Sequence, residues 1–314
     1  MILAGDIGGT KSLLGLFEPL THSPVHVANH ASAGFPDLES LLAHFLDGAR
    51  SALGASIAPT VACLGIAGPV HNGAVRVTNL PWHVDARRIR HRFSLARVDL
   101  INDFVAAAWG IDALAPKDLT TLQQGQVESG APRVVIGAGT GFGVAYSIMG
   151  PRGYRPVGGE GGHAGFAPAN PRQLALWRYL HAKFPRVTLE HVLSGRGLAT
   201  LHAFCSGSAD GLEAPEVVRR ALEEHDPAAS AALDLFIECY GSAAGDFALH
   251  VMGRGGVYVT GGIAAHILER MAGGGFIAAF NDKAPFAEHL SNMPVHIVTS
   301  RQVGLLGAAA AAAA

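Results

Sequence analysis

Cysteine, charged residues and long apolar runs are all scarce in this sequence. Its 314 residues include three cysteines, Cys63, Cys205 and Cys239, which lie too far apart for a disulfide framework or a Cys-x-x-Cys metal site. Every apolar stretch is interrupted before the roughly 18 residues that a membrane span needs, and no basic segment precedes the first of them. We therefore expect a cytoplasmic protein with neither a signal peptide nor a membrane partner.

The charge balance excludes a second group of functions. There are 23 basic and 25 acidic residues, and the formal net charge is -2. Such a balance gives no reason to expect nucleic acid as a partner. With 49% hydrophobic and 15% charged residues, the composition is that of a compact protein long enough for two domains. Small-molecule chemistry is the expected class of function.

Glycine, in contrast, is abundant, and the first glycine-rich turn lies in residues 3–16, LAGDIGGTKSLLGL. Two apolar runs, the first containing Asp6, flank a polar turn, which predicts two strands joined by a hairpin. Gly8 and Gly9 let backbone N–H groups approach an anion such as phosphate, and Thr10 and Lys11 add a hydroxyl and a cation. For this stretch alone, an ordinary hairpin turn is the simpler interpretation.

The same pattern returns near the middle of the chain. Residues 133–136 lead into Gly137-Ala138-Gly139-Thr140-Gly141-Phe142-Gly143, and an apolar run over 144–149 follows. The repeat favours a duplicated nucleotide-binding domain. It is not a dinucleotide fingerprint, because Phe142 replaces the last glycine of G-x-G-x-x-G and the turn enters a strand, and neither turn contains a P-loop.

Asn102 and Asp103 follow a predicted strand, 98–101, and precede a predicted helix, 104–114. An Asn-Asp pair at such a junction is explained by helix capping. It is explained equally well by catalysis, because a carboxylate at the end of a strand that faces a cleft can act as a general base. The local sequence leaves both interpretations open.

Two more polar groups stand out in the second half. Glu160 and His163 lie among the glycines of residues 156–168, PVGGEGGHAGFAP, where they could project into a cavity; a mobile glycine loop is the alternative. With one histidine and no second ligand nearby, a zinc site is disfavoured. Glu190 lies in the first turn of a helix predicted over 188–193, where a carboxylate could simply complement the helix dipole.

The remaining segments complete the expected α/β alternation. Apolar spacing predicts a helix over 37–53 with Asp37 as its N-cap, and a buried strand over 255–262 that ends in the pair Gly261-Gly262. The basic run 85–93, DARRIRHRF, is expected to be a helix with a solvated face. Residues 115–132 are expected to connect two domains, and the alanine-rich segment 304–314 to form a last helix.

Taken together, these motifs resemble the bacterial, proteobacterial-type glucokinases of the hexokinase and actin-like ATPase superfamily. The resemblance covers nearly the whole chain, and the motifs that carry it are residues 4–10, 101–104, 137–141, 159–163, 192–195, 261–263 and 304–307. The sequence lacks the cysteine-rich zinc motif usual in the repressor and sugar-kinase group called ROK, and it has no N-terminal helix-turn-helix. Both absences disfavour a zinc-dependent ROK kinase or a repressor.

The resemblance implies an α/β fold of two ribonuclease-H-like domains with a cleft between them. The small domain would comprise 1–113 joined by the C-terminal helix 300–314, and the large domain 114–299. The implied reaction is ATP-dependent phosphorylation of glucose at the 6-hydroxyl, the first step of glycolysis, by a homodimeric enzyme. A kinase for another hexose such as mannose, or a nonenzymatic actin-like ATP clamp, is the alternative.

The resemblance also assigns roles to individual residues. Asp103 would be the catalytic base, and Asp6 would lie near Mg²⁺ through water. The sugar hydroxyls would be held by Asn102, Asp103, Glu160, His163 and Glu190. ATP would be held by Asp6, Gly8, Gly9, Thr10, Gly139, Thr140, Gly141, Gly261 and Gly262, with a further phosphate contact from Lys11.

Overall fold

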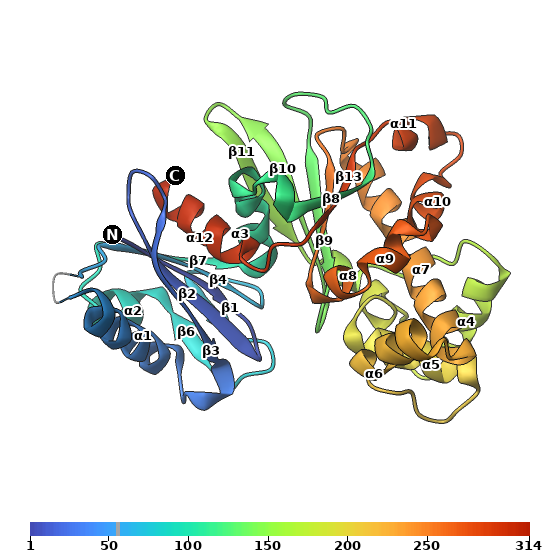
Figure 1. Ribbon diagram of the computed structural model, residues 1–314, viewed down its shortest axis with the longest axis horizontal. Coiled ribbons are helices and arrows are strands. Elements are labelled where there is room, and N and C mark those ends of the chain that lie inside the picture. The colour runs from blue at the N-terminus through green and yellow to red at the C-terminus, as the bar shows by residue number, and fades with distance from the viewer. Residues whose placement is uncertain (55–56) are drawn as a thin grey trace. The chain divides into compact units, whose positions relative to one another are not determined.

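A computed structural model describes residues 1–54 and 57–314 of the protein (Figure 1). The chain divides into two compact units, one formed by 1–115 with 300–314 and the other by 116–299. Each unit contains its own sheet and its own buried core, so each is described by itself. None of the described helices is both long and apolar enough to cross a membrane.

The first unit is built on a five-stranded sheet with the order β3-β2-β1-β4-β7. Strands β1 and β2 form an antiparallel hairpin in which Asp6 lies opposite Leu13, whereas β4 and β7 continue the sheet in parallel with β1. A two-stranded sheet, β5-β6, accompanies it. The bounds are β1 Ile2–Ile7, β2 Lys11–Phe17, β3 Pro24–Ala31, β4 Val61–Ile66, β5 Ala74–Arg76, β6 His83–Asp85 and β7 Arg97–Asn102.

Alternation along β1 divides the core of this unit into two layers. Leu3 and Ile7 pack in one apolar cluster with helix α1, and Ile2 and Ala4 pack in another with the C-terminal helix α12. Because side chains alternate between the two faces of a strand, Asp6 belongs to the α12 face. The helices are α1 Leu38–Leu53, α2 Ala86–Arg92, α3 Asp103–Gly110 and α12 Val303–Ala313, with 3-10 turns Ser32–Gly34 and Ile111–Ala113.

The C-terminal helix owes its place to its small residues. A methyl group at Gly307 would overlap the carbonyl oxygen of Ala106 in α3, and one at Gly110 would overlap the carbonyl oxygen of Val303. Ala308 and Ala309 are buried against β1 on the same helix. The predicted alanine-rich helix is confirmed, and its lack of side-chain bulk is what lets it pack closely on α3.

The second unit is built on a six-stranded sheet with the order β11-β10-β9-β12-β13-β8 (Figure 1). Here β9 and β10 form the antiparallel hairpin, β12 and β13 run parallel to β9, and β8 closes the far edge antiparallel to β13. The strands are β8 Leu119–Gln123, β9 Arg133–Ala138, β10 Phe142–Gly150, β11 Gly153–Gly159, β12 Val257–Thr260 and β13 Val295–Val298.

Helix α7, Pro227–Val251, is the main helix of the second core, which also takes in β9, β10 and the apolar faces of α5 and α10. The other helices are α4 Pro171–His181, α5 Gly195–Ser206, α6 Ala214–Arg219, α8 Gly262–His266, α9 Leu268–Ala272, α10 Gly275–Asn281 and α11 Ala287–Ser291. Short turns of other helix types occur at Pro116–Asp118, Gly161–His163, Leu189–His191 and Arg220–Glu224.

Four expectations about elements were wrong in extent or type. The polar stretch 115–132 is not only a connection, because it contains strand β8, and the glycine-rich loop begins inside strand β11. The helix expected over 104–114 ends as an α-helix at Gly110, and the one expected over 188–193 is a single 3-10 turn. The helices predicted over 37–53 and 85–93 are confirmed, with Asp37 and Asp85 as their N-caps.

Candidate active site

The first glycine-threonine turn joins β1 to β2 and is held by one buried serine. Ser32, from the 3-10 turn after β3, donates its backbone N–H to the Thr10 carbonyl at 3.0 Å and its hydroxyl to the Gly8 carbonyl at 2.8 Å. Its hydroxyl also lies 2.9 Å from that of Ser12. Ser32 donates hydrogen bonds to two carbonyl groups of the turn, which fixes the backbone of the turn. The side chains of Thr10 and Lys11 stay exposed.

Gly9 packs closely against its surroundings. A methyl group at this position would lie 3.0 Å from the carbonyl oxygen of Thr78 and 3.3 Å from the side chain of Asn79. The turn therefore packs against the loop that follows β5, and a larger residue would push it away. This close packing is consistent with the backbone approach that a phosphate site needs.

Asp6 is the carboxylate of this turn, and its environment is unfavourable to charge. It is partly buried on the α12 face, where a methyl group at Gly304 would lie 2.6 Å from Asp6 Oδ2. Burial, and to a smaller degree the charge of Asp103, raise the pKa of Asp6 to about 7. A bound cation would remove this disadvantage by favouring the ionised form.

Asn102 and Asp103 end β7 and begin α3. The Asn102 side-chain oxygen caps the helix, accepting the N–H groups of Phe104 at 2.9 Å and Val105 at 3.3 Å, and its amide donates to the Gly68 carbonyl at 3.4 Å. The Asp103 carboxylate accepts the Phe104 N–H at 3.0 Å. The capping interpretation of Asn102 is confirmed, and the cap fixes the residue that precedes the candidate base.

A glycine in β4 brings the carboxylates of Asp6 and Asp103 into electrostatic contact. Gly65 in β4 pairs with Asp6 on one side and with Ile101 on the other. A methyl group at Gly65 would lie 2.7 Å from the Cβ of Ala106, so α3 packs directly on the strand. This explains how Asp103, at the start of α3, influences the pKa of Asp6 across one strand.

The second glycine-threonine turn joins β9 to β10 and is held by segments far away in sequence. The buried hydroxyl of Tyr240 in α7 accepts the Ala138 N–H at 3.0 Å, and the Gly195 N–H at the start of α5 donates to the Gly139 carbonyl at 2.8 Å. The Gly139 N–H also donates to the Gly141 carbonyl at 2.8 Å. Thr140, at the tip, is exposed.

Glu190 contacts this turn directly. Its Oε2 accepts the Phe142 N–H at 3.0 Å, and a methyl group at Gly141 would lie 2.6 Å from the same oxygen. The Ser194 hydroxyl, which caps α5, donates to the Glu190 carbonyl at 2.8 Å. Glu190 is therefore bonded to the turn rather than serving only as a charge in the first turn of a helix.

Glu160 and His163 lie next to the same turn. They flank Gly161 and Gly162, and methyl groups at these glycines would clash with Val144 and with the carbonyl of Phe142. The segment that follows pairs with the one preceding Glu190, because the Leu189 N–H donates to the Ala164 carbonyl at 2.9 Å. Both side chains are exposed. The second unit thus gathers Glu160, His163 and Glu190 around the start of β10.

Gly261 and Gly262 end β12 and begin α8. Gly261 has a φ of 92°, and a methyl group there would lie 2.5 Å from the Ala138 carbonyl oxygen, so the backbone conformation and the packing both require glycine. Gly262 has open space around it. The start of α8 therefore lies beside the end of β9, next to the second glycine-threonine turn.

Sequence reasoning missed the groups that hold both turns. Ser32 and Tyr240 gave no signal, since each is an ordinary residue of its element and acts on a turn distant in sequence. Gly304 lay inside a motif that carried the resemblance, but its contact with Asp6 was not foreseen.

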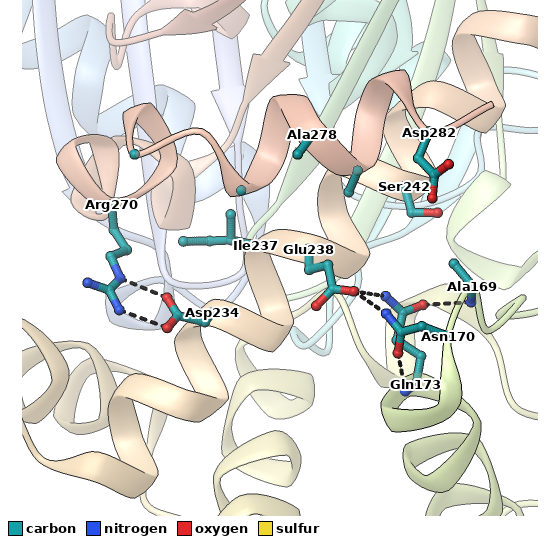
Figure 2. Close-up of a pocket in the computed structure, with 13 residues that line it drawn as sticks. Ala169, Asn170, Gln173, Asp234, Ile237, Glu238, Ser242, Arg270, Ala278 and Asp282 are labelled. Atoms are coloured by element: carbon teal, nitrogen blue, oxygen red, sulfur yellow. Dashed lines mark hydrogen bonds and ion pairs between the residues drawn. The ribbon is translucent and has the colours of Figure 1, made fainter. Parts of the chain in front are cut away.

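A cavity of about 690 Å³ lies elsewhere in the second unit, between α4, α7 and α10 (Figure 2). Arg270 and Asp234 form an ion pair at one end, and at the other the Gln173 amide donates to the Glu238 carboxylate at 2.9 Å. None of the predicted site residues lines it. Size alone therefore does not locate the predicted site.

Comparison with known proteins agrees with this architecture. A family model described as Glucokinase matches residues 3–314. A glucokinase of Nostoc sp. is 37% identical over 342 residues, covering 100% of this chain and 99% of the relative, and one of Mesorhizobium japonicum is 38% identical over 315 residues, covering 98% and 90%. The crystal structure of a glucokinase from an Antarctic psychrotroph superposes with a TM-score of 0.86 at 32% identity, covering 99% of this chain and 98% of that one.

These matches extend over essentially the full length of both partners, so they concern the whole chain rather than one motif. The expected fold class, an α/β protein of two actin-like ATPase domains, is confirmed by this similarity together with the two sheets of related strand order. The chain belongs to the glucokinase family.

Proposed function

We propose that this protein transfers the γ-phosphoryl group of ATP to the 6-hydroxyl of glucose, giving glucose 6-phosphate and ADP. The observation that carries the proposal is the full-length family match. The arrangement of residues supports it, because each unit has a glycine-threonine turn fixed by buried groups and carboxylates or a histidine close by. A protein that only bound nucleotide would have no need of Glu160 and His163.

The two turns, with Gly261 and Gly262, would hold ATP. Mg²⁺ fits the first unit, because the partly buried Asp6 has a raised pKa and a second carboxylate nearby. Among the described residues no group of three or more His, Cys, Asp or Glu could hold a metal by itself. This suits Mg²⁺, which is usually held by one or two carboxylates, water and substrate phosphates, and which neutralises phosphate charge when bound.

Asp103 would act as the general base. The 6-oxygen of glucose forms a bond to the γ-phosphorus while the bond from that phosphorus to the bridging oxygen of ADP breaks, and the hydroxyl proton passes to the Asp103 carboxylate. The cap at Asn102 and the Phe104 N–H fix the position of this carboxylate. Positioning of this kind supplies much of the rate in phosphoryl transfer.

The sugar would be held by Asn102, Asp103, Glu160, His163 and Glu190. A site built to bond several hydroxyls discriminates against a sugar that lacks or inverts one, since buried polar groups are then left unpaired. We therefore propose glucose as the preferred acceptor, with another hexose such as mannose as the alternative. We also propose that 1–113 with 300–314, and 114–299, act as the small and large domains of a cytoplasmic homodimer.

The experiment that tests the proposal measures ADP release in a coupled assay across a panel of sugars and phosphoryl donors. Glucose with MgATP should give the highest kcat/KM, and chelation of Mg²⁺ should abolish turnover. Equal rates with galactose, fructose and N-acetylglucosamine would contradict the specificity, and ADP release that no sugar stimulates would favour an ATP clamp.

A further inference from the structure

The two carboxylate oxygens of Glu190 differ in their hydrogen bonding. Oε2 accepts the Phe142 N–H at 3.0 Å and is therefore bonded to the second glycine-threonine turn. Oε1 accepts no hydrogen bond from the described residues and so remains able to accept one from a ligand. The side chain is only partly buried, which leaves room for a ligand to reach it.

The backbone on both sides of Glu190 is fixed. Its carbonyl accepts the Ser194 hydroxyl, and the adjacent Thr188 and His191 form a capping box in which the Thr188 N–H donates to His191 Nδ1 at 3.1 Å. Movement of the carboxylate is therefore confined to side-chain rotation. A hydrogen bond to Oε1 would restrict that rotation and hold Oε2 against the turn.

His191 lies within electrostatic reach of both Glu190 and His163. Burial lowers the pKa of His191, the charge of Glu190 opposes this shift, and His163 adds to it. His163 is itself a proposed sugar-binding residue. Within the second unit, Glu190 is therefore bonded to the proposed phosphate turn and has His191 as an electrostatic neighbour, which in turn interacts with His163.

We infer that Glu190 is a positioning residue that couples the two substrates: a sugar hydroxyl bonded to Oε1 orders the carboxylate, and Oε2 then holds the Gly139-Thr140-Gly141 turn in its phosphate-binding conformation. The inference rests on the proposed function. Sugar binding orders the turn and meets the free-energy cost of that ordering. ATP then binds a turn that is already ordered, so it binds more tightly. The effect is reciprocal, because a coupling free energy acts equally on both ligands.

Isothermal titration calorimetry on the full chain tests this inference with glucose and with AMPPNP and Mg²⁺, each alone and in the presence of the other. In the unmodified protein glucose should tighten AMPPNP binding at least about fivefold, the lower end of usual coupling between sites. Gly141→Ala places a methyl group 2.6 Å from Glu190 Oε2 without changing Glu190 itself. Gly141→Ala should bring the ratio of the AMPPNP dissociation constants without and with glucose close to one. Glucose alone should still bind to this variant.

Gly139→Ala is the matched control, because a methyl group there meets no atom within 4 Å although the position lies in the same turn. It should keep the coupling ratio whatever it does to AMPPNP affinity. Glu190→Gln, which retains one oxygen for the Phe142 N–H, should recover more coupling than Glu190→Ala.

The outcomes separate this inference from the proposed function. Glucose that fails to bind the unmodified protein contradicts the proposed function. If both ligands bind but the ratio in Gly141→Ala equals that of the unmodified protein, coupling is carried elsewhere and the role of Glu190 is wrong, while the proposed function stands.

Discussion

The two units of this protein are built on one plan. The orders β3-β2-β1-β4-β7 and β11-β10-β9-β12-β13 are the same, with antiparallel and parallel neighbours in the same places. Each sheet contains a hairpin, β1-β2 or β9-β10, whose turn contains glycine and threonine. The repeat visible in the sequence is therefore a repeat of topology.

The units differ in what surrounds this shared turn. In the first, the strand before the turn contributes Asp6, the start of α3 contributes Asp103, and Ser32 holds the loop. In the second, the strand before the turn has no acidic residue, and the turn is held by Tyr240 and Glu190 from distant segments. The first turn thus follows a strand that carries an acid, whereas the acid bonded to the second turn comes from a separate segment.

Removal of the acid that is proposed as base should give the largest effect. We predict that Asp103→Asn lowers kcat by at least about 10²-fold, because general-base catalysis contributes on the order of 10²–10⁴-fold. The measurement is steady-state ADP release at saturating glucose and ATP.

The thermal midpoint serves as the control and should stay close to that of the unmodified protein. Turnover within a few-fold of normal in Asp103→Asn would remove Asp103 from its role. The proposal that an acid of the first unit serves as the general base would then be wrong.

Helix packing provides the next prediction, which concerns the first unit alone. Gly307→Ala should lower the free energy of unfolding by about 3 kcal/mol, because the added methyl group overlaps the Ala106 carbonyl and α12 must move away from α3. Urea denaturation followed by far-UV circular dichroism measures the change.

Gly48→Ala is a matched control in α1, where an added methyl group meets no atom within 4 Å. It should raise stability by about 0.5–1 kcal/mol through helix propensity. A Gly307→Ala protein as stable as Gly48→Ala would show that the packing of α12 on α3 is adjustable.

Much of the fold could be predicted, because the signals that specify it are local. Apolar runs and a cap such as Asp37 located β1, β12 and α1, and the repeated turn indicated two related halves. Edge strands β8 and β11 were missed for a physical reason. Their sequences, LTTLQ and GYRPVGG, are polar or rich in glycine, and what makes them strands is pairing with β13 and β10 rather than their own pattern.

The sequence could predict those parts of the candidate site in which a single residue has a recognisable local context. Asn102 illustrates the limit, because its sequence context indicated capping and chemistry equally, and only the structure shows that its side-chain oxygen caps α3. Tyr240 could not be identified at all, since nothing in α7 reveals that its hydroxyl meets Ala138 over 100 residues earlier in the chain. The roles of the predicted residues stay predictions.

The difference in how the turns are held leads to a prediction of intermediate size. Tyr240→Phe leaves the buried Ala138 N–H without its acceptor, which should destabilise the protein by about 1–3 kcal/mol and weaken AMPPNP binding. Ser32→Ala in the first unit retains the bond from the residue 32 N–H to Thr10, so its effect on stability should be smaller. Unfolding midpoints and nucleotide titrations compare the two; a larger effect of Ser32→Ala would reverse the comparison.

The smallest effect should appear in the pH dependence of the first unit. Burial, then the charges of His44 and His26, lower the pKa of His30, whose ring centroid lies 5.4 Å from that of His44. A histidine whose pKa is lower in the folded state binds protons less readily than in the unfolded chain, so stability is lost as pH falls through about 6.5. His30→Gln should make the free energy of unfolding less dependent on pH between 8 and 5, whereas His22→Gln at an exposed position should not. Equal slopes for His30→Gln and the unmodified protein, from urea titrations at each pH, would place the acid sensitivity outside this cluster.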